Sequence, residues 1–218
     1  MRLLWYGDNC FKIQTKTQRG EKEITILMDP FSREIGLRPP QGQADIITLS
    51  SIELLTKKLK ALGDKTFLID SAGEYSIKGV AITGIESFQD KEKGELRGRN
   101  TIFTIESEGI RVCHMGNIGH SLTEEEIDEI GDVDILLIPV GNKDSLSLKE
   151  LKVMVGQLEP GIIIPMGYKL KGLKKKVNDC VDFCKEFGVS GRKKEDKLTV
   201  KAKDLKEKEN NLVILKAV

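Results

Sequence analysis

Two apolar runs in the second half of the chain constrain its fold most strongly. The runs are DVDILLIPV (132–140) and GIIIPMGY (161–168), and a segment with helical spacing (147–160) lies between them. Continuous apolar runs of this length are typical of strands that are buried on both faces. A strand, a helix and a second strand in succession predict a parallel sheet covered by helices.

The first half of the chain is predicted to be mostly strand. Short alternating runs occupy 2–7 and 10–16 around a Gly-Asp-Asn turn. Further strands are expected within 23–31, 44–51, 67–88 and 100–116, and again in the last two segments, 197–205 and 211–218. A strand-rich half followed by alternating strands and helices predicts stacked sheets with helices outside them, an α/β layered fold.

Four segments have helical patterns. Leucines recur at three- and four-residue intervals in 52–63, and 173–188 has the same periodicity. The segment 122–131 carries a capping box, in which Thr123 is the N-cap and Glu126 follows three residues later. Together with 147–160, these segments are expected to form the helical layers.

Composition limits the functional classes. The 218 residues are expected to form one domain, 1–218, and the formal net charge of +1 gives no overall attraction to nucleic acid or to anionic membranes. No apolar run is long enough to span a bilayer, and the four cysteines contain no CxxC pair. We therefore expect a cytoplasmic protein with reduced cysteines and no membrane association.

The order of several short motifs resembles that of the metallo-β-lactamase superfamily. The motifs are WYGDNCF, ILMDPF, ADIITLSS, GEYSIKGVAITGIESF, NTIFTIES, RVCHMGNIGH, DILLIPVG and IIIPMGYK. They are most similar to those of the small lactonase-like Zn-dependent hydrolases in that superfamily. The resemblance implies an αββα sandwich of two mixed sheets with helices on the outer faces, and a dinuclear metal site at one edge of the sheets.

The metal-binding positions that the resemblance implies are occupied by other residue types. The family's Ser/Thr-His-x-His-x-Asp-His loop falls on SSIELLT, its bridging aspartate falls in HMGN, and an early histidine falls on Asp8. The seven positions hold Ser51, Glu53, Leu55, Thr56, Gln89, Asn117 and Gly167. Of these side chains only that of Glu53 is a usual zinc ligand, since zinc is held by imidazole, thiolate or carboxylate groups.

This loss leads to the expectation of an inactive protein. Without metal ligands the chain is expected to have no zinc or other cofactor, and to be a pseudoenzyme with a binding, regulatory or assembly role. The alternative is a divergent metal-dependent hydrolase of phosphoesters or lactones that uses a single relocated ion. The candidate residues for holding such an ion are Asp29, Glu53, Asp90 and His114.

The same residues also have an ordinary structural interpretation. The acids can be loop-end residues, and alternation along IRVCH places His114 on the face of Ile110 and Val112, which favours a buried histidine. Ser50 and Ser51 lie at the end of a buried strand, but no GxSxG motif accompanies them, which favours a capping role over a nucleophilic one.

Lysines follow the first and the last of the altered metal loops. They are expected either to ring the pocket mouth and attract a phosphorylated small molecule, or to form the solvated faces of two helices. The lack of neighbouring aromatic residues disfavours nucleic acid, while a protein partner or a second copy of the chain stays open. The candidate rim residues are Lys57, Lys58, Lys174 and Lys175.

Overall fold

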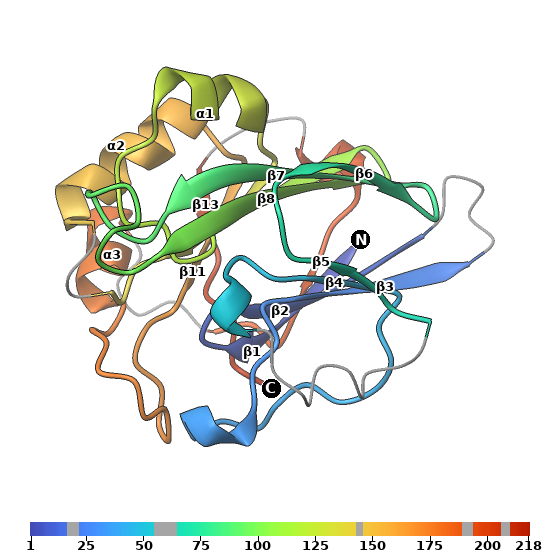
Figure 1. Ribbon diagram of the computed structural model, residues 1–218, viewed down its shortest axis with the longest axis horizontal. Helices are drawn as coiled ribbons and strands as arrows, with labels where there is room; N and C mark the ends of the chain where they lie inside the picture. Colours follow the sequence, from blue (N-terminus) through green and yellow to red (C-terminus); the bar gives the residue numbers. More distant parts are fainter. Residues whose placement is uncertain (17–21, 55–64, 143–145, 189–193, 206–209) are drawn as a thin grey trace.

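Two mixed β-sheets lie face to face in the computed structural model (Figure 1). The structure describes residues 1–16, 22–54, 65–142, 146–188, 194–205 and 210–218. Helices gather at one side of the second sheet, which gives an α/β sandwich. The fold class that the sequence predicts is therefore confirmed.

The first sheet contains six strands among the described residues, in the order β12-β1-β2-β3-β4-β5. Its β12, β1, β2 and β3 pair antiparallel, and β3, β4 and β5 pair parallel. The strands are β1 (Arg2–Gly7), β2 (Cys10–Lys16), β3 (Glu23–Met28), β4 (Ile46–Thr48), β5 (Phe67–Ile69) and β12 (Leu198–Thr199).

The second sheet contains seven strands in the described ranges, in the order β13-β11-β10-β9-β8-β7-β6. Its β13, β11, β10 and β9 pair parallel, and the remaining strands pair antiparallel. The strands are β6 (Gly73–Ile77), β7 (Val80–Phe88), β8 (Arg99–Ser107), β9 (Ile110–His114), β10 (Ile135–Pro139), β11 (Ile162–Met166) and β13 (Asn211–Leu212).

Two of the predicted helices form, and each begins with a capping box. In α1 (Glu124–Ile130) the capping box of Thr123 and Glu126 is present, and α2 (Leu148–Leu158) begins with a second box formed by Ser147 and Glu150.

Of the other two helix predictions, one is wrong over most of its length and the other is tested only at its first three residues. The segment 173–188 forms only the short α3 (Val181–Glu186), because the backbone before it is bonded to distant loops: Asn178 N donates to Gly141 O at 2.7 Å, and Lys174 N donates to Ile35 O at 2.8 Å. The segment 52–63 begins as the 3₁₀ helix η2 (Ile52–Leu54), and its residues 55–63 lie outside the described part. Two further 3₁₀ helices, η1 (Arg33–Ile35) and η4 (Ala202–Leu205), lie in loops.

The main hydrophobic core fills the space between the sheets. Trp5 and Phe11 of the first sheet share one buried cluster with Ile105 and Val112 of the second. A smaller cluster around Leu27 and other residues lies apart from it. The four cysteines are all free and buried, and no helix among the described residues is long and apolar enough to cross a membrane.

Candidate functional site

Five loops meet at one edge of the sandwich. They follow β4, β7, β9, β10 and β11, so that each leaves the carboxyl end of its strand. Hydrogen bonds join the two sheets at this edge: Thr101 N of β8 donates to Ser50 O at 2.8 Å, and Asn9 Nδ2 donates to Gly116 O at 3.1 Å. Carboxyl ends of parallel strands are a common location for binding sites in α/β folds.

A chain of neutral polar side chains links four of these loops, those that follow β4, β7, β9 and β10. Gln89 Nε2 donates to Ser51 Oγ at 3.3 Å and to Arg99 O at 3.0 Å. Asn117 Nδ2 donates to Gln89 Oε1 at 2.8 Å, and Asn142 Nδ2 donates to Asn117 Oδ1 at 3.2 Å. We call Ser51, Gln89, Asn117 and Asn142 the amide chain. It brings together three of the seven positions at which the resemblance implies metal ligands.

The direction of the amide chain is fixed by its ends. An exchange of the Gln89 amide nitrogen and oxygen would place two acceptors against each other at Arg99 O, and the backbone N–H of Asn117 is held by Asn100 Oδ1 at 2.8 Å. The amides of Gln89 and Asn117 therefore have defined partners. Neutral amides that are already bonded to one another are poor ligands for a divalent transition metal ion.

Gly167 occupies a position where a side chain would not fit easily. Its φ is +67°, and a Cβ atom there would lie 2.9 Å from Asn9 Oδ1. Its backbone N–H donates to Asp8 O at 2.9 Å, which fixes the loop after β11 against the turn between β1 and β2. The local backbone thus suits glycine and disfavours a ligand side chain.

Beside the amide chain lies a fully buried polar cluster. Ser50 donates to both carboxylate oxygens of Asp29, from its backbone N at 2.7 Å and from its Oγ at 2.5 Å. His114 Nδ1 accepts from Gly116 N at 3.1 Å, so the ring proton is on Nε2, which donates to Asn9 O at 2.8 Å. His114 Nε2 is 4.0 Å from Asp29 Oδ2. Both ring nitrogens of His114 are therefore occupied.

Burial controls the ionisation of this cluster. Burial raises the pKa of the Asp29 carboxyl, against the opposing effects of His114 and Ser50. Burial also raises the pKa of the Cys10 thiol, and the nearby carboxylates of Asp29 and Asp8 raise it further. Cys10 is therefore a neutral thiol, which is a poorer metal ligand than a thiolate.

The residues expected to hold a relocated ion do not converge. Asp29 and His114 are neighbours, but the carboxylate of Asp90 accepts from four backbone N–H groups of the loop that follows it, between 2.6 and 3.2 Å. Burial would raise the pKa of Asp90, but these donors hold it below its usual value. Glu53 is exposed on η2. Among the described residues there is no group of three or more His, Cys, Asp or Glu placed to hold a metal.

Several predicted residues can be placed only in part. Leu55, Thr56, Lys57 and Lys58 lie outside the described residues. At the other end of the expected lysine rim, Lys175 Nζ is 2.5 Å from Asp8 Oδ2, so its charge is paired within the protein.

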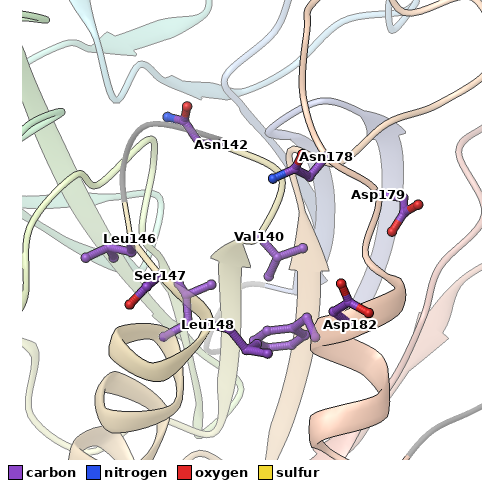
Figure 2. A pocket seen from close by; sticks show the side chains of 10 residues that line it. Val140, Asn142, Leu146, Ser147, Leu148, Asn178, Asp179 and Asp182 are labelled. Atoms are coloured by element: carbon purple, nitrogen blue, oxygen red, sulfur yellow. The ribbon is translucent and has the colours of Figure 1, made fainter.

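A pocket of about 450 Å³ adjoins the amide chain (Figure 2). It lies between the first turns of α2 and α3, at the carboxyl end of β10. Leu146, Ser147 and Leu148 lie on one side and face Asp179 and Asp182 on the other, with Val140 between them. The remaining lining residues are Asn142, Leu151, Asn178 and Phe183.

Sequence reasoning missed Asn142 and this pocket. The signal for Asn142 was a polar amide soon after the buried strand 132–140, where parallel strands place functional groups. The pocket had no comparable signal, because 173–188 resembled one continuous helix. Its early part is instead non-helical and bonds to Ile35 and Gly141.

Comparisons with known proteins agree with this architecture. A family model described as the beta-lactamase superfamily domain matches residues 2–167. A UPF0173 protein of Pyrococcus furiosus is 30% identical over 190 residues, which are 77% of this chain and 83% of that protein. A UPF0173 metal-dependent hydrolase of Archaeoglobus fulgidus is 22% identical, over 88% of this chain and 92% of that protein.

A solved structure is similar over nearly the whole chain. It is the crystal structure of a Thermotoga maritima protein described as a candidate Zn-dependent hydrolase of the metallo-beta-lactamase superfamily. The two chains are 32% identical, the TM-score is 0.75, and the match covers 99% of this chain and 98% of the other.

These relatives contradict two of the expectations drawn from the sequence. The expectation of a catalytically inactive pseudoenzyme is wrong, and so is the expectation of no cofactor, because relatives that align over most of their length are metal-dependent hydrolases. Both expectations followed from the combined loss of ligand side chains at nearly all seven positions, and that loss does not by itself establish that the protein is inactive.

Proposed function

Since this chain belongs to the family of the beta-lactamase superfamily domain, we propose that it is a metal-dependent hydrolase of small lactones or phosphoesters. The observation that carries the proposal is the meeting of five strand-end loops at one edge, four of which are joined by the amide chain, in a chain that matches hydrolase relatives over most of its length. We place the reaction at that edge.

The described residues do not fit the dinuclear zinc site of the family. Gln89 and Asn117 are neutral and bonded to each other, Gly167 has no side chain, and both nitrogens of His114 are engaged. We therefore assign no ligand to the ion and derive no step through it.

The chain's own residues can bind and orient the substrate. Asn142 Nδ2 uses one N–H in its bond to Asn117, and within the described part of the chain its second N–H and its side-chain oxygen have no hydrogen-bond partner. Asn142 is half-buried and borders the pocket. A positioned N–H donor in a partly buried site can stabilise negative charge that develops on a carbonyl or phosphoryl oxygen.

The experiment combines metal analysis with hydrolysis assays on the full chain. Protein purified without chelators is analysed for metals, and is then assayed with a γ-lactone and with bis(p-nitrophenyl) phosphate, with and without added Zn²⁺, Mn²⁺ or Mg²⁺. We expect hydrolysis that depends on one of these ions. The absence of both bound metal and metal-dependent hydrolysis of either substrate would refute the proposal.

Two substitutions test the location of the reaction. Asn142→Leu removes the free amide and should lower kcat/KM at least about tenfold, a typical effect of losing one donor to developing charge. Gln14→Leu is the matched control, because Gln14 lies on β2 and bonds to Arg2 and Glu23, away from this edge. Equal activity of the two variants would move the reaction away from the amide chain.

A further inference from the structure

We propose that the pocket between α2 and α3 binds a small molecule with an apolar body and a positively charged amine. As a statement about substrate, this inference rests on the proposed function, because it assigns the pocket to the part of the substrate next to the bond that is cleaved. As a statement about binding, it depends only on the pocket. Nothing in the family assignment specifies such a ligand.

The location of the pocket connects it to the candidate site. Asn142 lines the pocket and also donates to Asn117, so one side chain belongs to both. A molecule seated in the pocket would therefore reach the amide chain without further movement of the protein. The volume of about 450 Å³ is within the range of about 300–1,000 Å³ that is common for small-molecule sites.

The floor of the pocket is apolar and belongs to the core. Leu151 and Phe183 are both 3% exposed and form part of the main hydrophobic cluster. Leu146 belongs to the same cluster, while Val140 and Leu148 are half-buried against it. An apolar floor of this kind favours an alkyl or ring group of a ligand. It offers no hydrogen bond or opposite charge to a charged group.

The rim of the pocket is anionic. Asp179 and Asp182 are both exposed there, and none of the described lining residues is a lysine or arginine. Lys185 lies 3.6 Å from Asp182, but both side chains are largely exposed, at 61% and 84%, so this pair is weak. A phosphorylated ligand would meet repulsion at this rim, and an ammonium group would be attracted.

The N-terminal ends of α2 and α3 do not reverse the preference of the pocket for an ammonium group over a phosphate. The start of a helix attracts anions through free backbone N–H groups. At α2 the backbone N–H of Glu150 is taken by Ser147 Oγ, and the Glu150 carboxylate is itself paired with Lys91 Nζ at 2.6 Å. At α3 the backbone N–H of Val181 is taken by Asp179 Oδ1 at 2.9 Å.

A ligand with hydrogen-bonding groups has a further partner in the pocket. The side-chain amide of Asn178 lines it, and has no hydrogen-bond partner among the residues that the structure describes. Asn178 is held in place through its backbone, whose N–H donates to Gly141 O and whose carbonyl accepts from Lys169 N. The unused amide can therefore bond to a polar group of the ligand at little cost in ordering.

Direct binding of four hexyl compounds tests the proposal without any turnover. Hexylammonium, hexanol, hexanoate and hexyl phosphate are titrated into the full chain at neutral pH and low salt, and shifts of backbone amide resonances are followed. We expect hexylammonium to bind at least tenfold more tightly than hexanol, with the largest shifts near 146–151 and 178–183. Tighter binding of hexanoate or hexyl phosphate would overturn the proposal.

Charge-neutral variants give the second arm of the test. In the double variant Asp179→Asn and Asp182→Asn, hexylammonium should lose most of its advantage over hexanol, and hexanol affinity should change less than twofold. Asparagine can still accept the Val181 N–H, so α3 should keep its start. Asp128→Asn on exposed α1 is the matched control and should leave all affinities unchanged.

The outcomes separate this inference from the proposed function. If the preference for ammonium survives the double variant, or if it is absent, the pocket assignment is wrong even when metal-dependent hydrolysis is present. If the preference is found and is lost in the double variant, the binding site stands even when no hydrolysis is detected.

Discussion

Asn117 holds the middle of the amide chain, and its two bonds need an amide rather than a carboxylate. Its Nδ2 donates to Gln89 Oε1, while its Oδ1 accepts from Asn142. Asn117→Asp, which restores the family's residue type, would place two acceptors against each other at the Gln89 contact. We expect the free energy of unfolding at pH 7 to fall by about 1–3 kcal/mol, the usual cost of an unmade bond in a partly buried site.

The pH dependence of this variant supplies its control. Below about pH 4 the new carboxyl group becomes protonated and can again donate to Gln89, so the loss of stability should shrink. Urea denaturation of the wild type and of Asn117→Asp at pH 7 and pH 3.5 measures both effects. Asn178→Asp, at a side chain without a described partner, should show neither effect. Equal stability of Asn117→Asp and the wild type at pH 7 would contradict the described bond direction.

Gly116 shows how closely the loops pack at this edge. Its φ is +60°, and a Cβ atom would lie 2.2 Å from Asn100 Oδ1 and 2.7 Å from Ser50 Cβ. Gly116→Ala should therefore lower the free energy of unfolding by about 2–4 kcal/mol through strain and overpacking. Gly156→Ala on α2 meets nothing within 4 Å and should raise stability by about 0.5–1 kcal/mol. Thermal denaturation of both variants tests this opposite behaviour. A change of Tm in the same direction for both variants would refute the prediction.

At the scale of elements, the start of α2 combines a cap with an ion pair. Glu150 Oε2 accepts from Ser147 N and Oγ, and Glu150 Oε1 pairs with Lys91 Nζ at 2.6 Å. The Lys91 bond, together with those from Ser147, lowers the pKa of Glu150 from 4.5 to about 2. A carboxyl group whose pKa is lower in the folded state stabilises the fold above the unfolded pKa, and this stabilisation is lost as the pH falls.

Glu150→Gln isolates the charge, because glutamine can also form the capping box. We expect the variant to be less stable than the wild type by about 0.5–1 kcal/mol at pH 7. The difference should vanish as the pH falls from 4.5 towards 2, as chemical denaturation at a series of pH values would show. Glu129→Gln, at an exposed position near the end of α1, should cause no such loss. If the difference in the free energy of unfolding between the variant and the wild type is the same at every pH, the charge of Glu150 does not stabilise the fold.

Whether an element could be predicted from the sequence depends on whether its backbone hydrogen bonds are local or reach distant segments. Segments whose bonds are local were predicted correctly, as for α1 with its capping box and the hairpin of β1 and β2. The segment before α3 was not, since its backbone groups pair with Gly141 and Ile35, far away in the sequence. Apolar periodicity indicates which side chains are buried. It cannot distinguish a helix from an irregular segment whose backbone is hydrogen-bonded to loops far away in the sequence.

The candidate site was predictable to a similar extent. The motif order located Ser51, Gln89 and Asn117, and the structure joins them in one chain. Loss of ligands at these positions did not establish loss of function, because relatives over the same span are metal-dependent hydrolases. A motif specifies which side chain stands at one position of a fold, whereas metal binding depends on every group that reaches the site.

At the scale of the whole molecule, the final segment of the described chain connects the two sheets. Val213 N donates to Ile163 O in the second sheet, and Val218 N donates to Trp5 O in the first, both at 2.9 Å. Between these bonds Leu215 is 1% exposed and belongs to the main core. The sequence predicted one strand over 211–218, but only Asn211 and Leu212 form β13, because the chain then crosses from one sheet to the other.

This crossing predicts a large difference between two adjacent side chains. Leu215→Ala leaves a cavity between the sheets and should lower the free energy of unfolding by about 2–5 kcal/mol. Lys216→Ala removes only a surface ion pair with Asp196, at 2.9 Å and largely exposed, and should change stability by less than about 0.5 kcal/mol. Urea denaturation compares the two. Because the segment bonds to both sheets, Leu215→Ala should also speed amide hydrogen exchange at Trp5 and at Ile163, whereas faster exchange in one sheet alone would show that the sheets are stabilised independently.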